Sequence, residues 1–219
     1  MILSIITDIE GTTTPISFVH RVLFPYARSR LADFIAAQPE HPALADIPEP
    51  KLQNLLAWMD RDEKITSLKT IQGEIWQQGY QQGALKGEIY PDVAPALRRW
   101  ARAGLKLYVY SSGSVTAQKL LFGHTPEGDL TPLFQAYFDT KIGAKRESGS
   151  YSAIARALGG LPSEALFLSD VEAELDAAAQ AGLTVCQLVR AQDHTKPSTH
   201  HQTASDFNEI AIRFGLPHA

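Results

Sequence analysis

The chain has 219 residues, 44% hydrophobic and 20% charged, which is the composition of an ordinary soluble globular protein with room for one domain and a small insert. Its formal net charge of -4 gives no general attraction to nucleic acid or acidic membranes, so local cations or a metal ion must hold an anionic substrate. The single cysteine, Cys186, excludes an internal disulfide, and its apolar surroundings predict a buried structural thiol. No stretch reads as a signal peptide or a membrane span, and we expect a cytoplasmic protein.

The first predicted strand ends in two acidic residues. Residues 1–7 form a short apolar run rich in Ile, Asp8 follows directly, and Glu10 comes two residues later, before Gly11 breaks the strand. In a parallel α/β sheet the ligand crevice lies beyond the carboxyl ends of the strands. Asp8 and Glu10 are therefore candidates for a nucleophile and a Mg²⁺ site. Taken alone, the pattern favours an acidic strand end followed by a turn, at which Asp8 caps the next segment, and the rest of the chain reverses that preference.

Residues 16–85 show helical periodicity and no strand signal. Three apolar stripes at helical spacing cover residues 24–35, 52–59 and 68–76, and a proline-rich loop at 39–50 separates the first from the second. We therefore expect an all-helical domain at residues 16–85, inserted into a domain made of residues 1–15 and 86–219.

From Gly87 onward, predicted strands alternate with predicted helices. The strands are expected at 105–110, 136–139, 165–168 and 183–189, with helices at 91–103, 114–122, 151–158 and 172–180. This alternation predicts an α/β fold with a doubly wound parallel sheet and right-handed crossovers. The tail from Arg190 is polar, and we expect its histidines to lie in a solvated loop, because their spacing matches no common metal-ligand pattern. Those histidines are His194, His200 and His201.

The later strands bring further polar groups to the same sheet edge as Asp8. Ser111, Ser112 and Gly113 follow the strand at 105–110, Lys145 follows the strand at 136–139, and Asp170 follows the strand at 165–168. Hydroxyls and backbone N–H groups at a helix N-terminus bind phosphate oxygens, and a lysine offsets the charge of a transferring group. Together with carboxylates that hold Mg²⁺, these groups predict phosphoryl transfer.

Several of these assignments have alternatives. Lys141 competes with Lys145 for the lysine role, and Glu174 either stands beside the metal or is an exposed helix charge. The serines and Asp170 also fit ordinary helix capping. An acyl-transfer serine has no support, because the chain lacks Gly-x-Ser-x-Gly.

The order of these elements resembles that of the haloacid-dehalogenase superfamily of phosphotransferases, over nearly the whole chain. On this resemblance the nucleophile motif ends in Asp8, the hydroxyl motif in Ser111 and the lysine motif in Lys145, and the second acidic motif carries Asp170. The helical insert resembles the type-1 cap of that superfamily, which closes over the site and shapes the substrate pocket. The resemblance thus implies a Rossmann-like core with an inserted helical cap.

Longer stretches are similar to the enolase-phosphatase family of methionine salvage. They are Asp-Ile-Glu-Gly-Thr-Thr-Thr-Pro-Ile at 8–16, Tyr-Ser-Ser-Gly-Ser-Val-x-Ala-Gln-Lys-Leu-Leu-Phe-Gly-His at 110–124, and Phe-Asp-Thr-Lys-Ile-Gly-x-Lys at 138–145. Most phosphatases of the superfamily have Asp-x-Asp where this chain has Asp8 and Glu10. The resemblance implies Asp8, Glu10 and Lys145 as catalytic residues, and Ser111, Ser112 and Lys145 as ligands of the substrate phosphate.

The same resemblance implies one Mg²⁺ per chain, held by Asp8, Asp170 and the backbone carbonyl of Glu10, whose carboxylate handles protons. The implied reaction enolises 2,3-diketo-5-methylthiopentyl-1-phosphate and then dephosphorylates it to the acireductone. The alternative is another capped phosphatase or phosphonatase of the superfamily, and a more distant one is a phosphate-binding module without activity. We expect a monomer that binds a small phosphorylated diketone and neither nucleic acid nor membrane.

Overall fold

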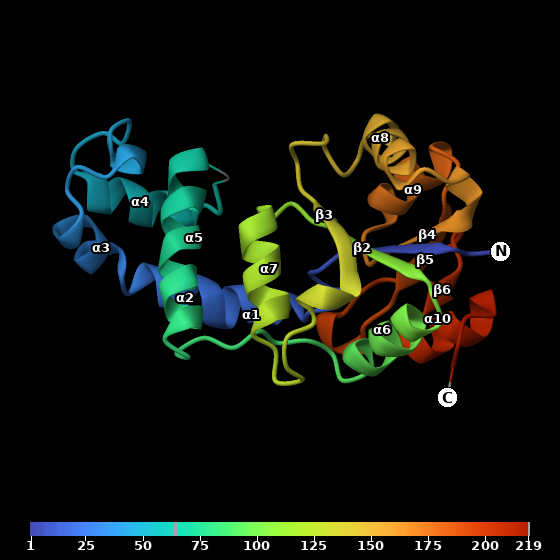
Figure 1. Cartoon of the computed structure of the whole chain (residues 1–219). Coiled ribbons are helices and arrows are strands. Elements are labelled where there is room, and N and C mark those ends of the chain that lie inside the picture. Colours follow the sequence, from blue (N-terminus) through green and yellow to red (C-terminus); the bar gives the residue numbers. More distant parts are fainter. Residues whose placement is uncertain (64, 219) are drawn as a thin grey trace. The chain divides into compact units, whose positions relative to one another are not determined.

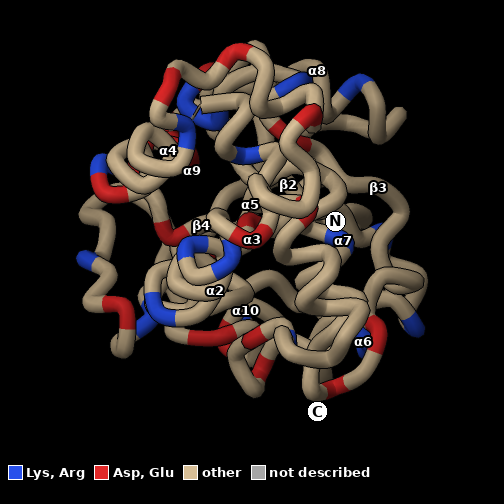
Figure 2. The backbone as a smooth tube through the Cα atoms, turned by 90° about the vertical axis from the view of Figure 1, so that its left-hand side faces the viewer, with Lys and Arg blue, Asp and Glu red and all other residues tan. Residues whose placement is uncertain are grey.

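The computed structural model describes residues 1–63 and 65–218, and the chain divides into two compact units (Figure 1). One unit comprises Met1–Ile16 and Gly87–Ala219, and the other comprises Ser17–Lys86. Acidic and basic residues are interspersed along the chain (Figure 2). Among the described residues, no helix combines the length and apolar character needed to cross a membrane.

The first unit is built on a six-stranded parallel sheet with the order β3-β2-β1-β4-β5-β6. Its strands are β1 (Ser4–Thr7), β2 (Lys106–Tyr110), β3 (Phe134–Phe138), β4 (Ala165–Ser169), β5 (Thr184–Leu188) and β6 (Thr203–Ala204). β1 lies inside the sheet, where Thr7 is in register with Val109 on one side and with Leu168 on the other. The predicted parallel α/β sheet is confirmed.

Helices cover both faces of this sheet (Figure 1). They are α6 (Val93–Arg102), α7 (Val115–Gly123), α8 (Ser148–Leu158), α9 (Glu172–Gln180) and α10 (Phe207–Phe214). α8 and α9 pack on one face, where Ile6, Tyr151 and Phe167 are fully buried. α6 and α10 pack together on the opposite face, where Trp100 stacks on Phe207 at 5.3 Å between ring centroids. Because both faces are covered, the central strand is buried along its whole length.

The tail after Arg190, for which no strand or helix was predicted, contains both. β6 extends the sheet, and α10 buries Phe207, Ile210 and Ala211. The Asp206 side chain caps α10 by accepting a hydrogen bond from the Glu209 backbone N–H at 2.8 Å, and Gly215 ends it in the left-handed region. Phe207, Ile210, Ala211 and Phe214 recur at helical spacing, so this helix was detectable from the sequence and was missed.

The second unit consists of helices joined by turns and loops, with no strand among its described residues. Its elements are α1 (Ile16–Phe18), a π-helical turn (Val19–Leu23), α2 (Phe24–Arg28), α3 (Leu31–Ala37), a 3-10 turn (Pro42–Leu44), α4 (Lys51–Asp60) and α5 (Thr66–Gln81). Leu31, Phe34, Leu55, Ile71 and Ile75 are buried in its own hydrophobic core. The first apolar stripe does not form one continuous helix, because the chain turns at residues 29 and 30 between α2 and α3.

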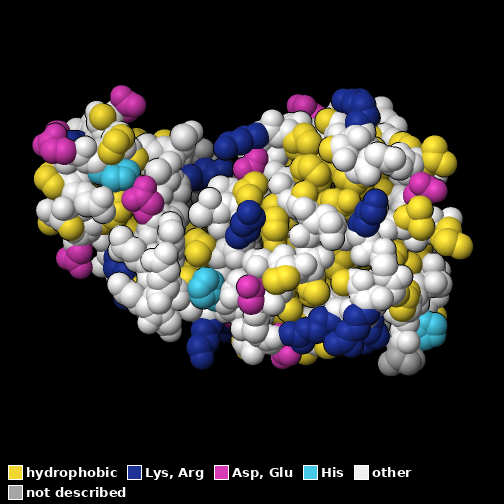
Figure 3. Space-filling model, viewed as in Figure 1, with side chains coloured by type: hydrophobic (Ala, Val, Ile, Leu, Met, Phe, Trp, Pro, Cys, Tyr) yellow, Lys and Arg dark blue, Asp and Glu magenta, His cyan; other side chains and the backbone are white. Residues whose placement is uncertain are grey.

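Basic side chains gather over α6 on the face of the molecule that Figure 3 shows. Arg98 lies 3.8 Å from a carboxylate oxygen of Glu127, and Arg99 donates a hydrogen bond of 2.9 Å to the Asn208 side chain. These two arginines therefore tie α6 to neighbouring segments of its own unit.

Candidate active site

The predicted site residues leave neighbouring strands at one edge of the sheet. Asp8 follows β1, Ser111 follows β2, and Asp170 follows β4. β2 and β4 pair with β1 in parallel register, and the Asp8 backbone N–H continues the ladder by donating to the Leu168 carbonyl at 2.9 Å. The carboxyl ends of parallel strands are the usual position of a ligand site in an open α/β sheet.

The Asp8 carboxylate is buried and held from several directions. Its Oδ1 accepts a hydrogen bond of 2.7 Å from the Ile9 backbone N–H and lies 2.7 Å from Lys145 Nζ. Its Oδ2 lies 3.3 Å from the Ser169 hydroxyl. This carboxylate is thus oriented by fixed donors, which suits a group that must present an oxygen to a substrate in one geometry.

Lys145 is buried between two carboxylates, with its Nζ 2.7 Å from Asp8 and 2.6 Å from Glu174. Burial by itself would lower the pKa of Lys145, but the charges of Asp8 and Glu174 outweigh it and the pKa is raised, so the side chain stays an ammonium. Lys141, the alternative lysine, is exposed.

The loop before α8 that carries Lys145 is held by hydroxyl groups. Tyr151 donates a hydrogen bond of 2.7 Å to the Lys145 carbonyl, and Ser150 donates one of 2.7 Å to the Ala144 carbonyl. Tyr110, the last residue of β2, donates one of 2.9 Å to the Gly143 carbonyl. These hydroxyls fix the loop backbone and thereby position the ammonium against Asp8.

Glu174 and Ser169 complete the arrangement and were not assigned these roles from the sequence. The Ser169 hydroxyl lies 2.9 Å from Glu174 Oε2 and accepts a hydrogen bond of 3.1 Å from the Val171 backbone N–H. Burial and the negative charge of Asp8 raise the pKa of the Glu174 carboxyl. The sequence expectation placed Glu174 beside the metal or on an exposed face, whereas the structure places it against Lys145.

Asp170 faces the loop that follows Asp8. An ideal Cβ at Gly11 would lie within 2.9 Å of both oxygens of the Asp170 carboxylate, so the two segments approach closely only because position 11 is glycine, at a φ of +70°. Burial and the charge of Asp8 raise the pKa of Asp170 to about 7. Asp170 Oδ1 is buried and has no hydrogen-bond partner among the described residues. A buried carboxylate oxygen without a partner is suited to a cation.

The charge balance also favours a cation. Three carboxylates, those of Asp8, Asp170 and Glu174, interact electrostatically with each other and with one ammonium, that of Lys145. This leaves two uncompensated negative charges when all three carboxylates are ionised. Oxygen ligands of this kind match Mg²⁺, so the residues present fit the ion. Glu10 is exposed, and its backbone forms an isolated bridge with Thr14.

Ser111 is buried and Ser112 is exposed at the start of the α7 segment. The expectation that Ser111 and Gly113 offer free backbone N–H groups is wrong. The Ser111 N–H donates a hydrogen bond of 3.2 Å to the Phe138 carbonyl, and the Gly113 N–H donates one of 3.2 Å to Ser111 Oγ. Ser114, rather than Ser111 or Ser112, caps α7 through the Ala117 N–H. Since Ser111 Oγ already accepts a bond, its own proton can be donated to a phosphate oxygen.

Arg190 anchors the loop that follows Asp8. Its guanidinium donates to the Thr12 carbonyl at 2.8 and 3.2 Å and pairs with both oxygens of Asp92 at 3.0 Å. On the other side, Gln187 donates a hydrogen bond of 2.8 Å to the Asp170 carbonyl. Sequence reasoning gave neither residue a role, because each acts across segments that are far apart along the chain.

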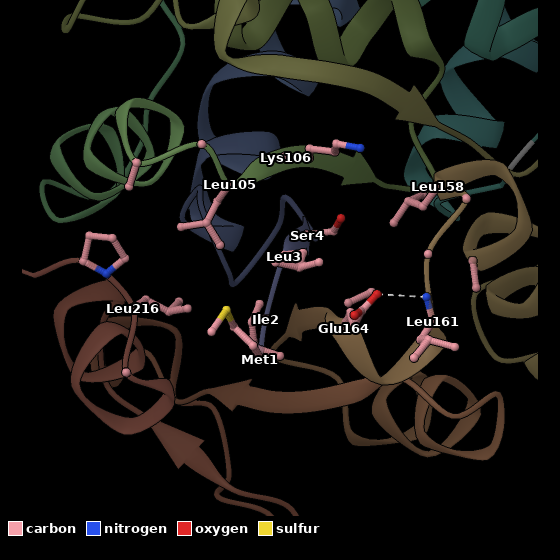
Figure 4. Close-up of a pocket in the computed structure, with 18 residues that line it drawn as sticks. Met1, Ile2, Leu3, Ser4, Leu105, Lys106, Leu158, Leu161, Glu164 and Leu216 are labelled. Atoms are coloured by element: carbon pink, nitrogen blue, oxygen red, sulfur yellow. Dashed lines mark hydrogen bonds between the residues drawn. The ribbon is translucent and has the colours of Figure 1, made fainter.

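A separate hollow of about 570 Å³ lies at the opposite edge of the sheet, where β1, β2 and β4 begin (Figure 4). Apolar side chains such as Met1, Leu158 and Leu161 line it. The Glu164 carboxylate accepts a hydrogen bond of 3.0 Å from the Leu161 backbone N–H, so it serves to close a turn. The ionic cluster of Asp8 and Lys145 is at the other edge.

A family model for haloacid dehalogenase-like hydrolases matches residues 2–182. The chain belongs to this family. It is 55% identical over 225 residues to a protein of Granulibacter bethesdensis named enolase-phosphatase E1, covering 98% of this chain and 97% of that protein. A protein of Enterobacter with the same name is 51% identical, with coverage of 96% and 97%. The expected membership of the enolase-phosphatase family is confirmed.

Solved structures share the fold of this family. The crystal structure of the UTR4 protein of Saccharomyces cerevisiae superimposes with a TM-score of 0.82 at 35% identity, covering 94% of this chain and 99% of that one. A phosphatase of Thermococcus onnurineus superimposes with a TM-score of 0.68 at 16% identity and full coverage of both chains, which shows a shared fold alone.

Proposed function

We propose that this chain is an enolase-phosphatase of methionine salvage. It enolises 2,3-diketo-5-methylthiopentyl-1-phosphate and then hydrolyses the phosphate ester to 1,2-dihydroxy-3-keto-5-methylthiopentene and phosphate. The observation that supports phosphate chemistry is the buried Asp8 carboxylate, 2.7 Å from Lys145 Nζ at the carboxyl edge of the sheet. The choice of substrate is supported by the likeness to a full-length relative named enolase-phosphatase E1 at 55% identity.

Asp8, Asp170 and the backbone carbonyl of Glu10 would hold one Mg²⁺ per chain. When bound, the ion would offset the charge of the phosphate dianion against the carboxylates of the site. The unpartnered oxygen of Asp170 supports this assignment.

Asp8 acts as the nucleophile. One of its oxygens attacks phosphorus, the bond from phosphorus to the ester oxygen breaks, and an aspartyl phosphate forms. Glu10 supplies the proton to the leaving oxygen and then takes one from the water that attacks the aspartyl phosphate, which releases phosphate and restores Asp8. Its exposure beside the nucleophile loop is compatible with this exchange of protons.

Lys145 and the serines bind the transferring group. The ammonium of Lys145 faces Asp8 and lowers the cost of bringing an anionic phosphate to an anionic nucleophile. The hydroxyls of Ser111 and Ser112 donate to phosphate oxygens. Asp8 keeps its orientation throughout, because the Ile9 N–H donates to it from the same loop.

The helical unit, Ser17–Lys86, acts as a cap that sets substrate choice, since Asp8, Lys145 and Asp170 all lie outside it. The buried thiol of Cys186, whose pKa burial raises to about 12, is suited to the reducing cytoplasm in which we place the protein.

The test is to give the purified chain the diketo phosphate and follow enol absorbance and free phosphate together, with Mg²⁺ and then with excess EDTA. We expect both signals in Mg²⁺ and loss of phosphate release in EDTA. Simple aryl and sugar phosphates and a phosphonate serve as control substrates. A chain that leaves the diketo phosphate unchanged and hydrolyses one of the controls would be another capped hydrolase of the family, and the proposed substrate would be wrong.

A further inference from the structure

Two histidines and an aspartate meet on the surface of the α/β unit. His200 and His201 lie in the loop between β5 and β6, and Asp176 lies in α9. His200 Nε2 is 2.9 Å and His201 Nε2 is 2.7 Å from the same oxygen, Asp176 Oδ1. The two imidazole rings are 4.2 Å apart between centroids, and one ligand atom from each of the three residues lies within 4.8 Å of the others. Three groups that can bind a metal therefore converge on one point.

The loop holds both imidazoles in this position through Ser198. Its hydroxyl oxygen accepts hydrogen bonds from the backbone N–H groups of His200 at 3.2 Å and His201 at 3.1 Å, and donates to the Glu172 carboxylate. The Ser198 backbone N–H donates to the Gln187 side chain at 2.7 Å. The loop is thus fixed to the first turn of α9 at Glu172 and to β5 at Gln187. The convergence on Asp176 is built by these contacts.

Glu172 also orients one of the rings. It is four residues before Asp176 in α9, so both carboxylates lie on one face of the helix. Glu172 Oε1 lies 3.3 Å from His200 Nδ1, the ring nitrogen that does not face Asp176. A histidine that binds a metal through one nitrogen commonly donates the other N–H to a carboxylate, which leaves the lone pair of the first nitrogen for the metal. Glu172 gives His200 this arrangement.

The ligand types indicate which cation fits. Two imidazole nitrogens and one carboxylate oxygen suit Zn²⁺, Ni²⁺ or Cu²⁺, whereas Mg²⁺ prefers a shell of oxygens. Zinc bonds of about 2.0–2.2 Å in a tetrahedron place neighbouring ligand atoms roughly 3.3 Å apart. The distances of 2.7 and 2.9 Å to Asp176 would have to widen by about half an ångström. The side chains of His200 and Asp176 are 55% and 52% exposed, so they can rotate by this amount.

We propose that Asp176, His200 and His201 form a second metal site, specific for a borderline divalent cation such as Zn²⁺, with Glu172 orienting His200 and water as the fourth ligand. The site differs from the proposed Mg²⁺ site in residues and in ligand chemistry. A cation bound there clamps the β5–β6 loop onto α9. Its role is to stabilise the α/β unit, because a ligand that binds only the folded state shifts the unfolding equilibrium.

The experiment uses the full chain, freed of divalent cations by chelation and then placed in excess Mg²⁺ so that the oxygen site is filled. Zn²⁺ is titrated by calorimetry, and the ¹⁵N signals of the imidazoles report which ring nitrogens bind. We expect one Zn²⁺ per chain and a shift of the Nε2 signals of both His200 and His201. At a Zn²⁺ concentration about 100 times Kd, we expect Tm to rise by about 5–10 °C.

Variants separate a metal site from a hydrogen-bonded cluster. His201→Ala should lower the affinity for Zn²⁺ by more than about 100-fold, and Glu172→Gln, which changes the shape of the side chain little, by about 10- to 100-fold. His194→Asn is the matched control, since it removes an exposed imidazole from the same loop at a positive φ that asparagine tolerates. It should bind Zn²⁺ as the parent chain does.

Two results would overturn the proposal. One is the absence of Zn²⁺ binding in excess Mg²⁺, which would show that the three side chains only form hydrogen bonds to one another. The other is unchanged Zn²⁺ affinity in both His201→Ala and Glu172→Gln. Circular dichroism of each variant verifies that it is folded. If His201→Ala does not fold, the Zn²⁺ affinity of Glu172→Gln alone tests the proposal.

Discussion

Replacing Lys145 by methionine should separate the stability of the site from its chemistry. Methionine has a similar length but no charge, so Lys145→Met removes the ammonium that lies 2.7 Å from Asp8 and 2.6 Å from Glu174. The side chains of Asp8 and Glu174 are only 7% and 11% exposed. Removing one partner of such a buried pair costs about 3–5 kcal/mol, because the remaining charges stay buried and unpaired.

In a chain of this size 1 kcal/mol corresponds to about 2–4 °C, so Lys145→Met should lower the Tm of the metal-free chain by about 6–20 °C. The rate of phosphate release at saturating Mg²⁺ should fall by about 10²–10³-fold, the usual effect of removing one group that stabilises a developing charge. Calorimetry in EDTA measures the first effect, and a phosphate assay on folded protein measures the second.

Two further variants make this test specific. Lys141→Met removes an exposed lysine four residues away and should change stability by no more than about 0.5 kcal/mol, with phosphate release unaffected. The double variant Lys145→Met, Glu174→Gln also removes one of the two carboxylates that Lys145→Met leaves unpaired. It should therefore regain part of the lost Tm without regaining activity. The reasoning is refuted if Lys145→Met melts and turns over like the parent, or if Lys141→Met is the inactive variant.

Three other predictions concern the cation site and its charges. Asp170→Asn should raise the Mg²⁺ concentration for half-maximal phosphate release by about 10-fold or more, and an unchanged Mg²⁺ titration would remove Asp170 from the site. Gly11→Ala should do the same and cost a further 1–2 kcal/mol or so of stability, because position 11 requires a left-handed backbone that a Cβ disfavours and because that Cβ displaces the Asp170 carboxylate. Mg²⁺ titration and thermal melting together measure this. In the metal-free chain, burial raises the pKa of Asp170 to about 7 and also raises the pKa of Glu174. The folded state therefore keeps protons that the unfolded state releases between pH 5 and 8. Tm should fall as the pH rises through this range. Mg²⁺ should therefore raise Tm more at pH 8 than at pH 5, and equal shifts at both pH values would contradict the charge balance.

The strands and their ends could be predicted because they depend on local patterns. Apolar runs bounded by glycine or polar residues mark β1, β2, β4 and β5, and the parallel topology then brings Asp8, Ser111 and Asp170 to one edge without knowledge of any contact. The helical content of residues 17–86 likewise follows from periodicity. Its division into α2 and α3 does not, because one apolar face continues across the turn at residues 29 and 30.

Contacts between distant segments could not be predicted. The pairing of Glu174 with Lys145, and of both with Ser169, depends on how α9 packs beside the loop before α8. In the same way, the carboxylate that meets His200 is 24 residues earlier in the chain, so the histidines alone show no ligand spacing. The hydrogen bonds that the Ser111 and Gly113 N–H groups donate could not be predicted either, because their acceptors depend on the path of the loop.

The measurement that tests the central assignment most directly uses Asp8→Asn. This variant keeps the shape of the side chain and an oxygen for the metal but loses the anionic nucleophile. Phosphate release should therefore fall by several orders of magnitude. Enolisation needs no attack on phosphorus, so it continues and the enol phosphate accumulates. Enol absorbance and free phosphate are followed together in the same sample, with Mg²⁺ raised until the weakened site is filled. Rising enol absorbance without phosphate is the predicted result. Phosphate release near the parent rate would contradict the role of Asp8 as nucleophile.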